Sequence, residues 1–105
     1  MLSITNESDF QVGTGLVAVK FWATWCGPCK RLDPALQKME EEFGSKMKFL
    51  SIEIEQIPSI AQKHRIRTLP TILLLKNGRE INRITGLVLT EALRKAFRDF
   101  TKDIE

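Results

Sequence analysis

The segment of residues 16–23 limits most strongly what this chain can fold into, because it is almost entirely apolar. An apolar run of this length that is rich in β-branched and aromatic residues is typical of a strand buried on both faces of a sheet. Only Lys20 interrupts the run. A strand of this kind needs other elements packed on both of its sides, so the segment predicts a layered α/β domain.

The segments that follow alternate between helix and strand. Apolar residues recur at helical spacing over residues 28–43, and Gly44 is a typical helix end, so we predict a helix there. Residues 47–54 predict a second central strand, and residues 58–64 predict a short helical connector. The right-handed crossover of such a β-α-β unit puts helices on both faces of the sheet.

The second half of the chain carries a hairpin signal. Asn77 and Gly78, which both tolerate positive φ, lie between the apolar runs 71–75 and 80–84. We therefore predict an antiparallel hairpin there. A final helix follows, and Thr90 is its expected N-cap.

The N-terminal residues precede the first buried strand. Residues 2–5 are compatible with a further strand, and residues 6–12 predict a short helix. A secretory signal peptide would begin with basic residues followed by an apolar run, whereas residues 1–10 carry acids and amides. We therefore expect a cytoplasmic protein.

The composition is that of one soluble globular domain, which we expect to comprise residues 1–105. The chain has 105 residues, of which 43% are hydrophobic and 28% are charged. It has no apolar stretch of the roughly 20 residues that a membrane-spanning helix requires. The net charge is only +3 and no basic run exceeds two residues, so we expect no nucleic-acid partner. We also expect a monomer without a membrane partner.

Both cysteines of the chain lie in the run Trp25-Cys26-Gly27-Pro28-Cys29, between the first buried strand and the predicted helix. A disulfide between them closes a ring too small to restrict the unfolded chain much, so it is a poor structural staple. Stable structural disulfides are also rare inside cells. The spacing therefore predicts redox chemistry, in which Gly27 permits the tight turn and Pro28 stiffens it.

The two cysteines are expected to act one after the other. Cys26 precedes the helix, whose free amide groups stabilise a negative charge and should lower the pKa of its thiol. The thiolate is the species that attacks a disulfide. We therefore expect Cys26 to form a mixed disulfide with a partner, and the more buried Cys29 to resolve it.

A zinc site is an alternative for a Cys-x-x-Cys pair, but this chain offers too few ligands. A structural zinc site usually has four ligands, whereas the chain adds only His64 and carboxylates to its two cysteines. We expect no metal, although a site shared between two molecules stays open. We expect His64 to be a surface residue of the connector rather than a catalytic partner, so a cysteine-histidine hydrolase is not favoured.

Two segments of the chain resemble the thioredoxin family. Residues 21–30, Phe-Trp-Ala-Thr-Trp-Cys-Gly-Pro-Cys-Lys, are similar to the active-site stretch of thioredoxins, and residues 68–71, Thr-Leu-Pro-Thr, to their cis-proline loop. Gly86 matches the glycine that the family places beside the substrate groove. The likeness covers residues 7–102, and it implies a thioredoxin fold, a central mixed β-sheet flanked by helices on both faces.

The resemblance implies a general dithiol-disulfide oxidoreductase that acts as a protein-disulfide reductase in electron transport and cell redox homeostasis. Its substrates would be disulfide-containing proteins, and its electrons would come from a thioredoxin reductase. The chain has no flavin or nicotinamide fingerprint, so we expect no cofactor besides the redox-active disulfide. The alternative is a binding module or accessory subunit with the same fold, in which redox activity is dispensable.

The resemblance also implies a substrate-binding site. Pro70 would be cis and lie against the disulfide, while Leu69 would offer backbone hydrogen bonds to an extended segment. Thr68 and Gly86 would complete this site, and Trp25 would either cover its rim or be a partly buried aromatic residue. Four basic residues lie near these segments: Lys30, Arg31, Arg65 and Arg67. These basic residues either favour acidic partner surfaces or are ordinary solvated charges.

The main departure from the family is Lys20, which stands where thioredoxins usually have a buried aspartate. The usual lysine neighbour of that aspartate aligns with Ser51. Burial of an ammonium is unfavourable unless the group is paired or loses its proton. Three roles follow for Lys20. It accepts the Cys29 proton as a neutral amine, it stabilises a thiolate as an ammonium, or it reaches water or Glu53 and contributes only solubility or stability.

Overall fold

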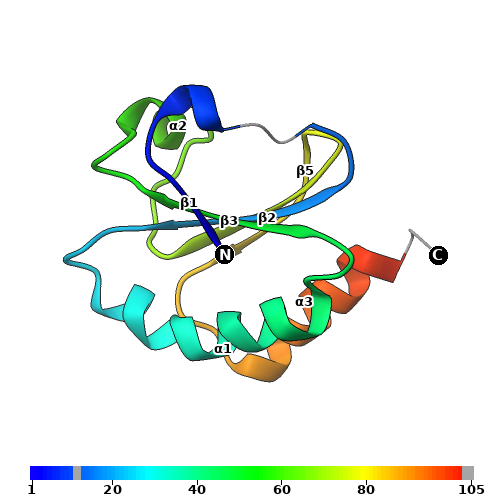
Figure 1. Cartoon of the computed structure of the whole chain (residues 1–105). Coiled ribbons are helices and arrows are strands. Elements are labelled where there is room, and N and C mark those ends of the chain that lie inside the picture. The colour runs from blue at the N-terminus through cyan, green and yellow to red at the C-terminus, as the bar shows by residue number, and fades with distance from the viewer. Residues whose placement is uncertain (11–12, 103–105) are drawn as a thin grey trace.

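The computed structural model describes residues 1–10 and 13–102, and a five-stranded mixed sheet lies at its centre (Figure 1). The strands lie in the order β1-β3-β2-β4-β5. Their bounds are β1 Leu2–Ile4, β2 Leu16–Trp22, β3 Lys48–Glu53, β4 Thr71–Lys76 and β5 Arg79–Thr85. Strand β3 runs parallel to both β1 and β2, whereas β4 pairs antiparallel with β2 and β5.

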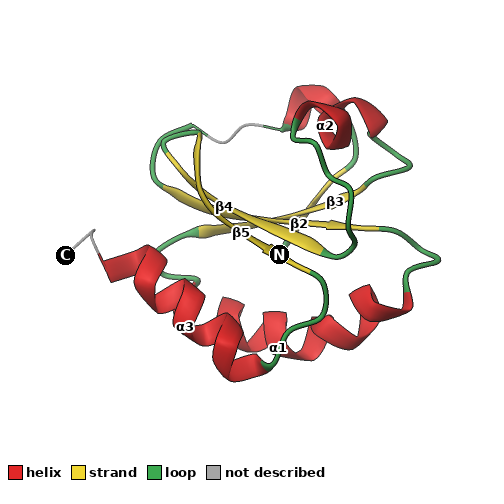
Figure 2. Cartoon of the chain, turned by 180° about the vertical axis from the view of Figure 1, so that it is seen from behind, coloured by secondary structure: helices red, strands yellow, loops and turns green. Residues whose placement is uncertain are grey.

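Helices cover both faces of this sheet, as the β-α-β crossover predicted (Figures 1 and 2). They are α1 Gly27–Phe43, α2 Pro58–Lys63 and α3 Thr90–Thr101, with a 3-10 helix at Glu7–Asp9. Helices α1 and α3 lie on one face, and α2 and the 3-10 helix lie on the other. No helix in the described ranges is long and apolar enough to cross a membrane.

Strand β2 is buried on both faces, which explains why its sequence is apolar apart from Lys20. Successive side chains of a strand point to opposite faces. Ala18 accordingly belongs to the core between the sheet and helices α1 and α3, and Val19 belongs to the core beneath α2. The predicted strand over residues 16–23 is confirmed as the central strand of the sheet.

Helix α1 forms where the apolar period predicted it. It follows its N-cap, Cys26, and it ends at Gly44, whose amide donates to the Glu40 carbonyl. Leu36 on its buried side packs in one core cluster with Phe97 of α3. This packing holds the start of α1 at the carboxyl end of β2, the edge of the sheet where α/β folds usually place their sites.

The predicted hairpin is confirmed, because Asn77 and Gly78 join β4 to β5. Both residues have positive φ, 51° for Asn77 and 80° for Gly78, as a two-residue type I′ turn requires. The side-chain oxygen of Asn77 accepts a hydrogen bond of 2.8 Å from the Gly15 amide. The turn is therefore tied to the residue that precedes β2.

Two local predictions differ from the structure. The helix expected at residues 6–12 is a single 3-10 turn, Glu7–Asp9, and residues 11 and 12 lie outside the described part of the chain. Thr90 is the first residue of α3 rather than its N-cap, which is Leu89. The strand expected around residues 2–5 is present as β1, and it pairs with β3.

Candidate active site

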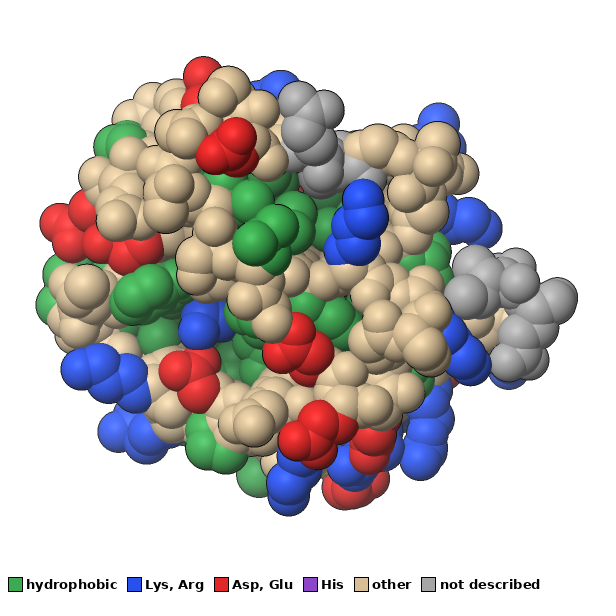
Figure 3. Space-filling view, in the orientation of Figure 1, with side chains coloured by type: hydrophobic (Ala, Val, Ile, Leu, Met, Phe, Trp, Pro, Cys, Tyr) green, Lys and Arg blue, Asp and Glu red, His purple; other side chains and the backbone are tan. Residues whose placement is uncertain are grey.

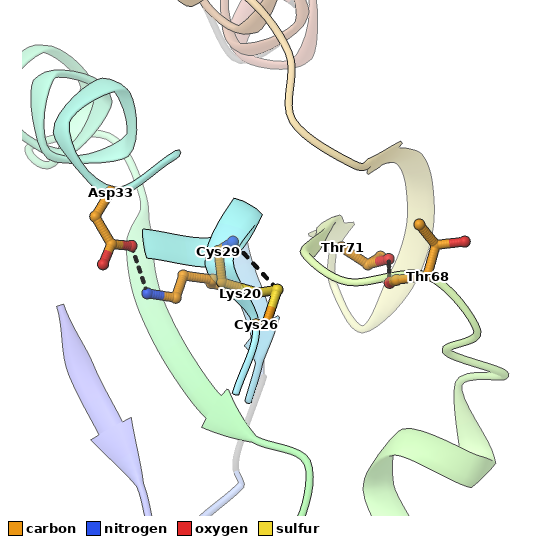
Figure 4. The surroundings of a disulfide bond; sticks show 6 residues. All are labelled: Lys20, Cys26, Cys29, Asp33, Thr68 and Thr71. Atoms are coloured by element: carbon orange, nitrogen blue, oxygen red, sulfur yellow. Dashed lines mark hydrogen bonds and ion pairs between the residues drawn. A yellow bond between two sulfur atoms is a disulfide. The ribbon is translucent and has the colours of Figure 1, made fainter. Parts of the chain in front are cut away.

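Cys26 and Cys29 form a disulfide where β2 ends and α1 begins (Figure 4). The Cys26 amide donates to the Ala23 carbonyl at 3.1 Å, which closes the turn before the helix. The Cys26 sulfur accepts a hydrogen bond of 3.2 Å from the Cys29 amide, so Cys26 acts as the N-cap. This amide has no partner within the helix. A thiolate at Cys26 would occupy the same position, where the helix start favours a negative charge.

Both cysteines are buried, with 4% of Cys26 and 2% of Cys29 exposed. Cys29 is the more buried residue, as predicted, but the difference is too small to separate the two roles. The positions of the two cysteines differ more clearly. Cys26 lines the groove described below, whereas Cys29 is not among the residues that line it. A partner that enters the groove therefore meets Cys26.

The predicted cis-proline loop lies beside the disulfide. The Leu69–Pro70 bond is cis, as the resemblance implied. The Thr71 hydroxyl donates to the Thr68 carbonyl at 2.5 Å, and the Gly86 amide donates to the Pro70 carbonyl at 2.7 Å. Leu69 packs against the small cluster of buried side chains that contains both cysteines. Two hydrogen bonds thus hold the loop, one from the first residue of β4 and one from the residue that follows β5.

A groove of about 400 Å³ opens between the cysteine turn and this loop. It is lined by Trp25, Cys26, Gly27, Pro28, Ile54, Ile66, Arg67 and Leu69. Five of these were predicted as site residues. Trp25 is 66% exposed, so it lies at the rim rather than partly buried. Thr68, Pro70 and Gly86 hold the loop without being among the lining residues.

Ile54 and Ile66 line the groove, although no motif in the sequence singled them out. A signal for Ile54 was present, because it directly follows β3, and parallel strands end at the same edge of a sheet. Its amide donates to the Trp22 carbonyl at 2.9 Å, which holds it near the cysteine turn. Ile66 follows Arg65, whose positive φ of 55° redirects the chain. Residue patterns do not reveal where a side chain points after such a bend.

Lys20 lies on the α1 side of β2 and forms an ion pair with Asp33 (Figure 4). The distance from Lys20 Nζ to Asp33 Oδ1 is 2.7 Å. Glu53, one of the options considered for Lys20 in its third role, is not the partner found: its carboxylate accepts a hydrogen bond from the Glu55 amide. Lys20 is therefore paired with a carboxylate, as the third role supposed, but with Asp33 instead of Glu53.

Asp33, the partner of Lys20, was not singled out by any motif in the sequence. It lies four residues after Cys29 on α1, so the two share one face of the helix. The Lys20 side chain is 11% exposed and that of Asp33 is 52% exposed, so the pair extends from the interior to solvent. Lys20 Nζ also lies 5.2 Å from the centre of the Trp22 ring. Ser51 is opposite Lys20 on β3, as the alignment with the family implied.

His64 is half-buried rather than a surface residue. Its ring contacts those of Phe10 and Phe21, at centroid separations of 5.9 Å and 6.2 Å. Burial, together with the charge of Lys63, lowers the pKa of His64 below its ordinary value of 6.5. Within residues 1–10 and 13–102, no three His, Cys, Asp or Glu side chains come together as a metal-binding cluster.

Known thioredoxins are similar to this chain in sequence and in structure. Residues 4–99 match the family model Thioredoxin. The thioredoxin of Staphylococcus aureus is 34% identical over 87 residues, which are 83% of this chain and 84% of that protein. The structure of Malassezia sympodialis thioredoxin is 33% identical, with a TM-score of 0.88 over 96% of this chain and 90% of the other. That of thioredoxin NaTrxh from Nicotiana alata is 28% identical, with a TM-score of 0.86 over 95% and 91%. Sequence, fold and cysteine geometry agree, and the chain belongs to the thioredoxin family.

Proposed function

We propose that this protein reduces disulfide bonds in other proteins, with Cys26 as the attacking thiol and Cys29 as the resolving thiol. The observation that carries the proposal is that Cys26 caps α1 and also lines a groove beside the cis-proline loop. A nucleophile is thus placed where a substrate can lie. Family membership supports the same activity, since a thioredoxin with an intact cysteine pair is a dithiol-disulfide oxidoreductase.

The proposed reaction consists of two thiol-disulfide exchanges. The Cys26 thiolate attacks one sulfur of the substrate disulfide, so that a mixed disulfide forms and the other substrate sulfur leaves as a thiolate. Cys29 then loses its proton and attacks the Cys26 sulfur, which releases the second substrate thiol. The substrate gains two electrons and the cysteine pair loses two. The Cys26–Cys29 disulfide of the structure corresponds to this oxidised product.

We propose that substrates bind as extended segments across the groove. Leu69, which precedes the cis proline and lines the groove, would offer its backbone groups to such a segment. Recognition through the main chain tolerates many side chains, which suits a reductase of varied proteins. Trp25 would cover the rim, while the hydrogen bonds of Thr68 and Gly86 hold the loop in place.

The proposed electron donor is a thioredoxin reductase, because each turnover leaves a disulfide that a two-electron donor must reduce again. The cysteine pair is itself a redox centre, so we propose that the protein holds no further cofactor. We also propose that it acts as a monomer in the cytoplasm, without a nucleic-acid or membrane partner. The modest net charge of +3 supports the absence of a nucleic-acid partner.

We propose that Lys20 acts as a paired ammonium rather than as a neutral base for Cys29. The Asp33 carboxylate at 2.7 Å satisfies the ammonium, and the ring of Trp22 adds a cation–π contact. At Cys29, the electric field of the Lys20–Asp33 pair is weaker than that of a lone ammonium would be, because the two opposite charges partly cancel. We therefore propose that the pair mainly stabilises the folded protein and changes the electrostatic potential beneath α1.

Reduction of insulin in the presence of dithiothreitol tests the proposed activity. We expect Cys26→Ser to abolish catalysis, because it removes the attacking thiolate. Cys29→Ser should instead accumulate a mixed disulfide with insulin, which non-reducing electrophoresis detects. Catalysis retained by Cys26→Ser would contradict the assigned chemistry, and negligible catalysis by the wild-type protein would favour a binding module.

A further inference from the structure

Of the described residues that line the groove beside Cys26, only Arg67 is charged, and we propose that its side chain selects disulfides with an acidic neighbour. Seven of the eight residues that line the groove are uncharged, and the eighth is Arg67. The proposal rests on the proposed reductase activity and specifies its substrate class. The preferred substrate is an extended segment with Asp or Glu within about two residues of the attacked cysteine, a span that one strand-like stretch covers.

The surroundings of Arg67 strengthen its attraction for a carboxylate. Ile54, Ile66 and Leu69 contribute apolar walls to the groove, and Trp25 adds an aromatic one. Apolar walls focus the field of a charge and reduce its screening by water once a substrate covers the groove. The planar guanidinium also matches a carboxylate in a two-point geometry that lysine lacks. A lysine in the same place on the substrate would be repelled.

Arg67 is available for a partner, unlike two other arginines of the fold, Arg83 and Arg94. Arg83 is paired with Glu80, and Arg94 is paired with Glu42. Within the part of the chain that the structure describes, no carboxylate pairs with Arg67, whose side chain is exposed. Its charge is therefore free to interact with a substrate rather than already neutralised.

The backbone that carries Arg67 is fastened to β5. The Arg83 guanidinium donates to the His64 carbonyl at 2.7 Å and to the Arg65 carbonyl at 3.2 Å. These two bonds hold the segment immediately before Arg67, so its side chain starts from a fixed position beside the groove. A recognition group that is held in place before binding loses less entropy when the partner arrives.

The charges around the groove add to the effect of Arg67. Lys30 and Arg31 are exposed near the start of α1, and Arg65 is exposed two residues before Arg67. Two exposed acids, Glu55 after Ile54 and Asp33 on α1, do not line the groove. Figure 3 shows basic side chains beside the start of α1 and acidic ones over the loop after β3. A seated segment therefore meets Arg67 rather than a carboxylate.

Single-turnover reduction of matched cystine peptides tests this preference. The peptides share one sequence, except that the residue beside each cysteine is Asp, Asn or Lys. Acid quenching followed by chromatography measures the rate constant with pre-reduced protein. At low ionic strength we expect the Asp peptide to react about threefold faster than the Asn peptide and the Lys peptide about threefold slower, the range of a partly screened ion pair. High salt should reduce both differences.

Substitutions of Arg67 should change the preference without unfolding the protein, because its side chain is exposed. Arg67→Gln should give equal rate constants, Arg67→Glu should reverse the order, and Arg67→Lys should retain part of it. Arg79→Gln is the matched control, since it removes the same charge from the β4–β5 hairpin, outside the groove. The control should keep the wild-type preference.

Equal rate constants for the three peptides with the wild-type protein would overturn the inference and leave the reductase activity standing. A preference that survives unchanged in Arg67→Gln, or that is lost equally in Arg79→Gln, would overturn its assignment to Arg67. Failure of the wild-type protein to reduce even the Asn peptide would overturn the proposed activity and this inference with it.

Discussion

The Lys20–Asp33 ion pair leads to an asymmetric prediction, in which replacing Asp33 destabilises the protein more than replacing Lys20. The Lys20 side chain is 11% exposed and that of Asp33 is 52% exposed. Asp33→Asn would leave a nearly buried ammonium without its counter-charge. Lys20→Met would instead leave a carboxylate that is half in water, and would add an apolar side chain to a buried strand.

The magnitude of this difference follows from the geometry of the pair. At 2.7 Å and an effective dielectric constant of about 20, the two charges attract by about 6 kcal/mol, most of which the desolvation of Lys20 offsets. Breaking a fully buried pair costs about 3–5 kcal/mol, and exposed pairs contribute about 0–1 kcal/mol. Because Asp33 is half exposed and Asn keeps an acceptor oxygen, we expect Asp33→Asn to lower the free energy of unfolding by about 1–2 kcal/mol. Lys20→Met should change it by less than about 0.5 kcal/mol.

Urea unfolding of the oxidised protein measures both changes as shifts of the midpoint at constant slope. The double variant Lys20→Met/Asp33→Asn should be about as stable as Lys20→Met, since neither keeps a buried charge. Asp99→Asn is the control, because its pair with Lys95 at 2.9 Å is exposed and should affect stability far less. A larger loss in Lys20→Met than in Asp33→Asn, or additive effects in the double variant, would refute the reasoning.

Three further predictions concern single groups. The pKa of the Cys29 thiol should be lower in the wild-type protein than in Lys20→Asp, because a neighbouring carboxylate opposes thiolate formation. Titration of the two reduced proteins measures this pKa, and a higher value in the wild-type protein would contradict the prediction. His64 has a pKa lowered by burial from 6.5, so the unfolded state binds its proton more readily. The free energy of unfolding should therefore fall as the pH drops through 6.5, and His64→Gln should make it depend less on pH in this range. Urea unfolding at several pH values measures this dependence, and the same dependence in His64→Gln would argue against a buried neutral imidazole. Asn77→Ala should lower the free energy of unfolding by about 1–2 kcal/mol, because alanine disfavours positive φ and lacks the acceptor for the Gly15 amide. Asn77→Gly, which relieves only the backbone, should recover part of this loss, and equal losses in the two variants would show that φ has no influence.

Much of the fold could be predicted because its signals are local. Strand β2 is apolar apart from Lys20 because both of its faces are covered, and the hairpin follows from two adjacent residues that tolerate positive φ. The start of α3 was misplaced by one residue, because the N-cap is Leu89, which has an extended backbone and caps the helix without a side-chain hydrogen bond. The candidate site was predicted in the same way, from motifs that contain Cys26 and Pro70.

The sequence by itself determined the order of the elements and placed an oxidisable cysteine pair at the start of a helix. Only the tertiary structure decided which carboxylate satisfies Lys20. The pattern of residues suggested Glu53 on the neighbouring strand, but the packing of α1 over β2 brings Asp33 to 2.7 Å, while Glu53 accepts from the Glu55 amide. The attraction between charges depends on their distance and their exposure to water, and both are set by how a helix lies on a sheet. The same reason applies to Arg67, whose place in the groove depends on segments that meet only in the folded chain.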